Sequence, residues 1–212
     1  MSDLLKVKVG GSDYLCKWTD PRYVEIGGRD YLTVKIGNQQ WLAENLDYMF
    51  DGLVFNPSDW NSTTRNCCYF HGGQTPYKSG YGMLYNGYAM KYLNDNCATL
   101  LPSGWHVPSK SEFSTLITAV GGTSVAGKKL KSTSGWASGN GTDDYGFTAL
   151  PAGAIFYYGA WTGDDVMTGY WTSTANGNTK SYRYRIQGGD EINESIYDNK
   201  YGYSLRLVKT LS

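Results

Sequence analysis

The sequence predicts an α+β protein, in which short strands, long loops and two helices form a main domain after a small N-terminal β appendage. Three observations support this fold class. Glycine supplies 27 of the 212 residues, and 19 tyrosines and 7 tryptophans together make 26. Helical periodicity is clear in only two segments, which leaves most of the chain to strands and loops. A short repeat near the N-terminus has the composition of two hairpins.

The N-terminal repeat consists of "VGGSDYL" at residues 9–15 and "IGGRDYL" at residues 26–32. Its Gly-Gly pairs can adopt the positive φ that tight turns require, and alternating residues such as Val7 and Val9 suit half-buried strands. We therefore expect one hairpin at each copy. Residues 1–32 are interpreted as a β appendage, used for homo-oligomerisation or attachment to a larger assembly, and residues 33–212 as the main domain.

The two helices are predicted within "NGYAMKYLND" (residues 86–95) and "PSKSEFSTLITAVGG" (residues 108–122). In the second, Ser109 and Glu112 have the spacing of a capping box, and Gly121-Gly122 supplies the stop. Each segment places apolar residues on one helical face, which indicates packing on a core. These residues are Tyr88, Ala89, Tyr92 and Leu93 in the first segment, and Phe113, Leu116, Ile117 and Val120 in the second.

The charge balance excludes some classes of partner. Nineteen basic and nineteen acidic residues give a formal net charge of zero, which disfavours binding to a nucleic-acid backbone or an anionic membrane. The N-terminal "MSDLLKVKVGG" lacks the apolar stretch of a signal peptide, and no window approaches the ~18 apolar residues of a membrane span. We expect no nucleic-acid partner, no membrane insertion and no export signal.

The sequence gives little support for a metal site, and we expect no cofactor. No cysteine belongs to a C-x-x-C pair, and only His71 and His106 could add imidazole ligands. His106 is expected to pack or to bond to the backbone before the second helix. Disulfide pairing stays open among the four cysteines, which are Cys16, Cys67, Cys68 and Cys97.

The segment "SYRYRIQGGDEINESIYDNKYGYS" (residues 181–204) has the composition of a binding surface. It contains five tyrosines but only three aliphatic residues. Tyrosine offers wide, rigid contact area at low entropic cost, and Ser, Asn and Gly offer adaptable hydrogen bonding. The alternative is an ordinary exposed hairpin, because Tyr also favours strands and Asn, Asp and Gly favour turns.

Six sequence blocks follow one another in a recognisable order. They are "TVKIGNQQWLAENL" (33–46), "YGMLYNGYAM" (81–90), "LPSGWHVPSKSEF" (101–113), "GFTALPAG" (146–153), "GYWTST" (169–174) and "YGYSLRLVK" (201–209). Together they resemble the Fibrobacter succinogenes major paralogous domain, which is found in many surface and lipid-anchored proteins of gut Bacteroidetes. The resemblance covers roughly residues 33–209 and implies a C-type lectin-like fold, with two helices, twisted antiparallel sheets and long loops.

The same fold is used by the variable proteins of diversity-generating retroelements, whose mutated codons yield Asn, Tyr, Ser and Asp among others. The resemblance places such a variable region between the last two blocks. The expected ligand-binding residues there are Asn176, Asn178, Tyr182, Tyr184, Asp190, Asn193, Ser195, Tyr197, Asp198 and Tyr201. A second interpretation assigns Tyr182 and Tyr184 to the scaffold, since "YRY" resembles a segment common in the family. By strand alternation, Tyr203, Leu205 and Leu207 should be core.

The enzymatic alternative is a glycan-active enzyme that uses paired carboxylates. Its candidates are Asp143 or Asp144 with Asp164 or Asp165, although loops of this composition are more often plain turns. The Glu-Pro-Asn and Trp-Asn-Asp signatures of calcium-dependent sugar-binding lectins are missing. Formylglycine-generating enzymes share the lectin-like fold but carry reactive cysteines late in the chain, and here no cysteine follows Cys97.

We therefore expect a non-enzymatic receptor-binding protein that contacts a protein or glycan on a target cell. A phage tail protein, hence a virion location, fits the missing signal; the alternative is a surface or fimbrial-tip adhesin of a gut bacterium whose leader was removed. Six aromatic residues in or beside the family blocks should be buried: Trp41, Tyr85, Trp105, Trp136, Phe147 and Trp171.

Overall fold

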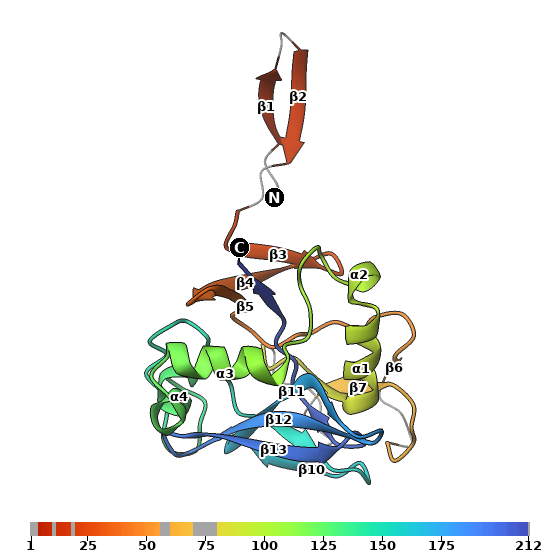
Figure 1. Ribbon diagram of the computed structural model, residues 1–212, viewed down its shortest axis with the longest axis vertical. Helices are drawn as coiled ribbons and strands as arrows, with labels where there is room; N and C mark the ends of the chain where they lie inside the picture. The colour runs from red at the N-terminus through yellow and green to blue at the C-terminus, as the bar shows by residue number, and fades with distance from the viewer. Residues whose placement is uncertain (1–3, 10–11, 18–19, 56–59, 70–79, 212) are drawn as a thin grey trace.

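The protein has a mixed α+β fold, as predicted. The computed structural model describes residues 4–9, 12–17, 20–55, 60–69 and 80–211 (Figure 1). These residues form three sheets and four helices. The largest sheet has the order β13-β12-β11-β9-β14-β8-β7-β6, with β10 paired to β9. Its strands are β6 (Val54–Phe55), β7 (Asn66–Tyr69), β8 (Met83–Asn86), β9 (Ala152–Ile155), β10 (Trp161–Asp164), β11 (Met167–Asn176), β12 (Lys180–Gln187), β13 (Ile192–Asp198) and β14 (Gly202–Tyr203).

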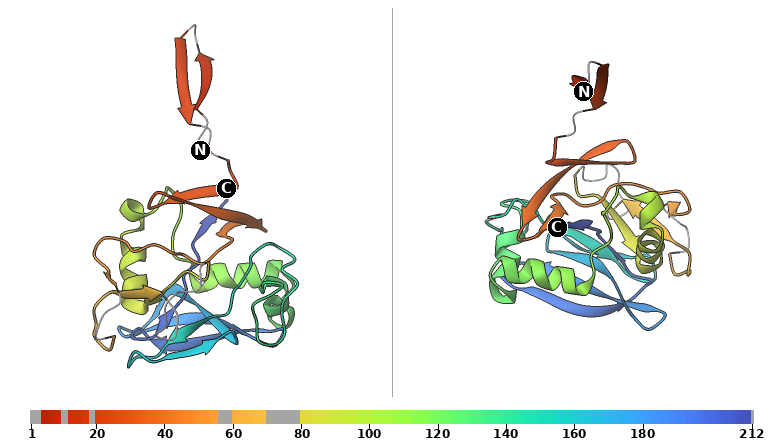
Figure 2. Two further views of the ribbon diagram at one scale, coloured as in Figure 1. Left: turned by 180° about the vertical axis from the view of Figure 1, so that it is seen from behind. Right: turned by 45° about the horizontal axis from the view of Figure 1, so that its top comes forward.

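Both copies of the N-terminal repeat form antiparallel hairpins. The first joins β1 (Leu4–Val9) to β2 (Ser12–Lys17), and Figures 1 and 2 show it apart from the other sheets. The second joins β3 (Tyr23–Ile26) to β4 (Arg29–Ile36) through Gly27 and Gly28, whose φ values of 61° and 80° confirm the expected turn geometry.

The second hairpin lies within the main fold, which differs from the expected boundary after residue 32. Its strands belong to a four-stranded sheet of order β15-β5-β4-β3, completed by β5 (Gln39–Leu42) and β15 (Val208–Thr210). Val24, Ile26 and Tyr31 are buried in the same cluster as Leu205 and Leu207. Only the β1–β2 hairpin therefore stands outside the shared core in the described part of the chain.

The two predicted helices are confirmed, and two more are present among the described residues. They are α1 (Gly87–Asp95) and α3 (Lys110–Ala119), and the capping box of α3 is complete between Ser109 and Glu112. The additional helices are α2 (Cys97–Leu100) and α4 (Thr123–Leu130). Helix α2 is one turn long, and neither α2 nor α4 has a side-chain cap, so both lack the signals that mark a helix in sequence.

The aromatic core is the one predicted. All six aromatic residues are at most 6% exposed, and Tyr203, Leu205 and Leu207 are at most 2% exposed. Figures 1 and 2 show α3 along one face of strands β11 to β13, where Phe113 lies against Tyr184 with ring centroids 4.9 Å apart. The opposite face of these strands carries Trp171 of β11, whose ring centroid lies 4.9 Å from that of Tyr203 of β14.

Two buried cations fasten loops to this framework. The Arg206 guanidinium donates to Asn45 Oδ1 at 2.8 Å, to the carbonyls of Leu42 (3.0 Å) and Thr148 (2.9 Å), and to that of Phe147. The Lys131 ammonium donates to four carbonyls, those of Gly139, Gln187, Gly188 and Gly189. Three of these carbonyls belong to the end of β12 and the turn into β13, so Lys131 fixes the hairpin on which the candidate site is built.

Candidate ligand-binding site

The predicted binding segment forms the β12–β13 hairpin, with β13 at the edge of the large sheet. Side chains alternate across a strand, and residues paired across an antiparallel ladder share a face. Ser181 pairs with Tyr197, Arg183 with Ser195 and Arg185 with Asn193. These six residues therefore share the face turned away from α3.

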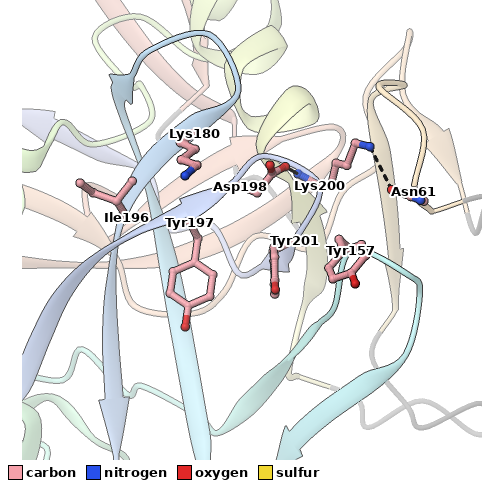
Figure 3. A pocket seen from close by; sticks show the side chains of 8 residues that line it. All are labelled: Asn61, Tyr157, Lys180, Ile196, Tyr197, Asp198, Lys200 and Tyr201. Carbon is pink, nitrogen blue, oxygen red and sulfur yellow. Dashed lines mark hydrogen bonds between the residues drawn. The ribbon is translucent and has the colours of Figure 1, made fainter.

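A groove of about 560 Å³ opens at the end of this hairpin near the turn into β14. Figure 3 shows three tyrosines in a row below the polar ends of Lys180, Asp198 and Lys200. The groove is lined by Asn61, Tyr157, Lys180, Ile196, Tyr197, Asp198, Lys200 and Tyr201.

Three hydrogen bonds hold the turn that carries the polar wall of the groove, one within the turn and two with the distant residues 60 and 61. The Lys200 backbone N–H donates to Asp198 Oδ1 at 2.9 Å, and the Lys200 ammonium donates to Asn61 Oδ1 at 3.0 Å. Behind the turn, Trp60 Nε1 donates to the Lys200 carbonyl at 2.7 Å. Two positions further on, Gly202 leaves room for Trp60, because a Cβ there would lie 2.7 Å from its ring.

The aromatic wall is a group of five contacting residues, here called the tyrosine cluster: Tyr157, Tyr158, Tyr197, Tyr201 and Tyr203. The Tyr197 and Tyr201 rings are nearly perpendicular with centroids 5.1 Å apart, and Tyr201 lies parallel to Tyr203. Tyr157 and Tyr158 are 45% and 59% exposed, whereas Tyr203 is buried. Burial raises the pKa of Tyr201, and the neighbouring Tyr197 adds to the shift. The cluster therefore extends from the exposed Tyr157 and Tyr158 to Tyr203 in the core.

Arg183 lies under the tyrosine cluster without a full set of hydrogen-bond acceptors. Its guanidinium carbon is 4.0 Å from the Tyr197 ring centroid and 4.4 Å from that of Tyr203. The residue is 2% exposed, and its Nε and Nη1 have no hydrogen-bond partner among the described residues, nor does Nε of Arg185. Burial lowers the pKa of Arg183, while Tyr203 and Tyr197 oppose that shift. Two cation–π contacts therefore take the place of hydrogen bonds here.

The structure brings together only part of the predicted site. Tyr197, Asp198 and Tyr201 line the groove, and Asn193 and Ser195 share a strand face with Tyr197. The remaining polar residues lie at the two ends of the sheet. Asn176 and Asn178 are exposed at the β11–β12 turn, and Asp190 is exposed at the opposite turn, 3.9 Å from the Lys128 ammonium.

Tyr182 and Tyr184 lie on the other face, against α3, and the structure corrects their assignment to the binding surface. Tyr184 is 3% exposed, and its hydroxyl donates to Glu194 Oε2 at 2.9 Å and lies 3.0 Å from Ser114 Oγ. Tyr182 lies below the Lys110 ammonium, 4.3 Å from its ring centroid. Both fit the interpretation that assigns them to the scaffold, because strand alternation turns them away from Tyr197.

Sequence reasoning missed the residues that other segments bring to the groove. Asn61 precedes β7, and Tyr157 belongs to the turn between β9 and β10. Lys180 and Lys200 lie inside the predicted variable region but are not among the ten expected ligand-binding residues. The run "IFYYGAW" (155–161) was the available signal, because three consecutive aromatic residues before a glycine suit an exposed turn better than a core strand.

The candidate catalytic and metal-binding residues have structural partners where they are described. His106 contacts Glu112 Oε1 through Nε2 at 2.7 Å and the Gly104 carbonyl through Nδ1 at 3.1 Å, which confirms its expected backbone contact. Asp143 accepts hydrogen bonds from the backbone and hydroxyl of Thr148. Asp144 is exposed, and Asp165 lies in the turn before β11. The side chain of Asp164 lies outside the described part.

The described residues contain no cluster of three or more His, Cys, Asp or Glu that could hold a metal ion. Cys67 and Cys97 are free thiols, and burial raises the pKa of Cys67 to about 12. His71 and the side chains of Cys16 and Cys68 lie outside the described residues. None of the described helices is long and apolar enough to span a membrane.

One comparison with known proteins identifies the family. No curated protein and no solved structure matches the chain significantly. The Fibrobacter succinogenes major domain matches residues 34–209, which include both walls of the groove and the strands that carry them. The chain therefore belongs to the Fibrobacter succinogenes major domain family.

Proposed function

We propose that this chain is a non-enzymatic binding protein that holds a ligand of another cell in the groove between the tyrosine cluster and the Lys180–Lys200 wall. The observation that carries the proposal is the convergence of Tyr157, Tyr197 and Tyr201, from two separate segments, on one concave surface. Aromatic residues and arginine dominate binding hot spots, and ligand sites commonly combine apolar walls with a few placed polar groups.

The proposal includes a C-type lectin-like scaffold, supported by the family and by the two capped helices against antiparallel sheets. It also includes diversification by a retroelement, supported by the Asn, Ser, Asp and Tyr side chains along β13. A phage tail protein is the preferred setting, and an adhesin of a gut bacterium is the alternative. The DNA sequence beside the gene would test diversification. Diversification requires a near-copy of the codons for residues 170–208, differing only at adenines, next to a reverse transcriptase gene.

No observation favours the glycan-active enzyme, because Asp143 is engaged by Thr148 in a turn. The N-terminal hairpin remains a proposed site of homo-oligomerisation. Its strands are described, but its side chains lie outside the described part. Sedimentation of the full chain beside a chain that starts at residue 20 would test it, since loss of a dimer on truncation is the expected result.

Tyr157→Ala tests the groove most directly, with Tyr23→Ala as a matched control. Tyr157 is 45% exposed in the groove, and Tyr23 is 44% exposed on β3 in the other sheet. We expect Tyr157→Ala to weaken binding to intact gut bacterial cells by about 2 kcal/mol, a typical hot-spot loss, while both variants melt like the parent. Equal binding by the two variants would place the binding surface elsewhere.

Tyr197 and Tyr201, two of the expected ligand-binding residues, combine two roles. Both pack on the core, because Tyr197 lies over Arg183 and Tyr201 is parallel to Tyr203. Changing both to Ala should therefore weaken binding by at least about 2 kcal/mol and also lower the free energy of unfolding by about 2 kcal/mol. An unchanged melting temperature, which an exposed loop would give, would contradict this packing.

A further inference from the structure

The groove is electropositive although the chain as a whole has no net charge. Lys180 and Lys200 line it beside a single carboxylate, that of Asp198, whose Oδ1 already accepts the Lys200 backbone N–H. Neither lysine forms an ion pair with any carboxylate in the described part of the chain. The chain carries equal numbers of acidic and basic residues. The excess of positive charge in the groove therefore comes from where these residues lie, and not from the net charge of the chain.

Two arginines add to this excess from below. Arg183 is buried under Tyr197 and Tyr203, and Arg185 follows it on the same strand face. Both have guanidinium N–H groups that no described residue accepts, and neither forms an ion pair with a described carboxylate. A buried cation normally has paired hydrogen bonds, as Arg206 does here. Unpaired positive charge beneath a binding surface favours a negative ligand.

The dimensions of the groove select the kind of ligand. Stable contacts between folded proteins use about 20–30 residues on each side, whereas eight residues line this groove. Its volume of about 560 Å³ lies within the range of small-ligand pockets. Tyrosine faces can cover the C–H face of a sugar ring, while the Lys200 ammonium, which uses one N–H for Asn61 Oδ1, has others for its hydroxyls. The groove therefore fits a short glycan better than a protein surface.

We infer that the groove recognises an acidic sugar residue of a glycan, with its carboxylate or sulfate ester held near Lys180 and Lys200 and its ring against the tyrosine cluster. This inference rests on the proposed function and names its ligand class. Arg183 supplies a fixed positive charge beneath the Tyr197 and Tyr203 rings, and Arg185 lies further along the same strand face. Asp198 positions Lys200 through the turn and limits how close a second acidic group can come.

The test uses the full chain on a printed array of defined neutral, sialylated, uronic-acid-containing and sulfated glycans, with hexaglutamate as an acidic peptide probe. We expect the chain to bind glycans of the acidic groups. Comparing the sialylated and uronic-acid-containing glycans with the sulfated ones will show whether the groove takes a carboxylate or a sulfate ester. Calorimetry then compares the best acidic glycan with its neutral counterpart. The acidic form should bind at least about ten-fold more tightly, the gain from one charge-assisted hydrogen bond.

Charge-removal variants sharpen the same test. Lys180→Gln with Lys200→Gln should lower affinity for the acidic glycan at least about ten-fold, and leave its weak binding of the neutral counterpart unchanged. Lys35→Gln is the control for each of the single variants Lys180→Gln and Lys200→Gln, because Lys35 is an exposed residue of β4 in the other sheet and its loss removes the same single positive charge. Raising the salt concentration should weaken binding of the acidic glycan only.

Several results would overturn the inference. They are preferential binding of neutral glycans, absence of any bound acidic glycan, stronger binding of hexaglutamate than of the glycans, or equal losses in Lys35→Gln and the double variant. The proposed function would survive each of these if Tyr157→Ala still abolished cell binding. Conversely, unchanged cell binding by Tyr157→Ala would refute the proposed groove, whatever the array shows.

Discussion

Two buried arginines of this protein, Arg206 and Arg183, have opposite surroundings. Arg206 is enclosed by an amide oxygen and three backbone carbonyls, and is fully buried. Arg183 is 2% exposed and is covered by two tyrosine rings, with Nε and Nη1 unpartnered among the described residues. The first arrangement stabilises a fold, because every acceptor around the cation depends on it. The second maintains positive charge near a surface at a cost in solvation.

The largest effect is expected at Arg206. Arg206→Met should lower the free energy of unfolding by about 3–5 kcal/mol, since it leaves Asn45 Oδ1 and the carbonyls of Leu42, Phe147 and Thr148 buried without their donor. Urea unfolding followed by tryptophan fluorescence would measure the loss. A change below about 1 kcal/mol would break the comparison, because Arg206 would then be no more structural than a surface residue.

A much smaller effect is expected at Arg183. Arg183→Met removes a buried charge whose Nε and Nη1 have no hydrogen-bond partner among the described residues, and an apolar side chain of similar length can fill its place. The loss of two cation–π contacts opposes this gain, so the free energy of unfolding should change by no more than about 1 kcal/mol. A loss as large as that of Arg206→Met would show that the two arginines have the same structural role.

The smallest effect is expected for His106 and Glu112, a part-exposed ionic pair that shows what an ordinary charge contributes. The hydrogen bond to Glu112 raises the pKa of His106 above its ordinary value of 6.5. Burial opposes ionisation of Glu112, but hydrogen bonds from His106 and Ser109 outweigh it and lower the pKa of Glu112 to about 2, from an ordinary 4.5.

The sign of each shift defines the pH window of this pair. The raised pKa of His106 gives stability that is present below pH 6.5 and is lost as pH rises through the raised value. The lowered pKa of Glu112 gives stability that is present above pH 4.5 and is lost as pH falls towards 2. His106→Gln should therefore cost about 1 kcal/mol or less between pH 4.5 and 6.5, and still less at alkaline pH. Thermal melts across this range would measure it, and an unchanged loss at high pH would contradict the assignment.

Ligand binding provides a separate test of His106, which we expect to have no part in the groove. His106→Gln should bind cells as the parent does, because His106 pairs with Val208 and contacts Glu112 and Gly104, none of which lines the groove. Loss of a catalytic rate in that variant would instead revive the enzymatic alternative.

The sequence by itself determined the features that depend on neighbouring residues. The capping box of α3 needs only Ser109 and Glu112 three positions apart, and the β3–β4 turn needs only Gly27 and Gly28. Tyr203, Leu205 and Leu207 are buried as their apolar character predicts, but Ser204 and Arg206 between them are buried too, which alternation did not predict. The order of the six blocks was sufficient for the family, which matches residues 34–209.

Only the tertiary structure decided which residues form the groove. Tyr157 reaches Tyr201 because β9 pairs with β14, and Asn61 reaches Lys200 across 139 positions of the chain. The pairing of β12 with β11 sets the register of β12, and the packing of α3 on one face of these strands places Tyr184 against Phe113 and leaves Arg183 on the other face, against Tyr197. Arg183 and Arg206 are alike in sequence, and they differ because their partners come from distant segments whose positions depend on the packing of the whole chain.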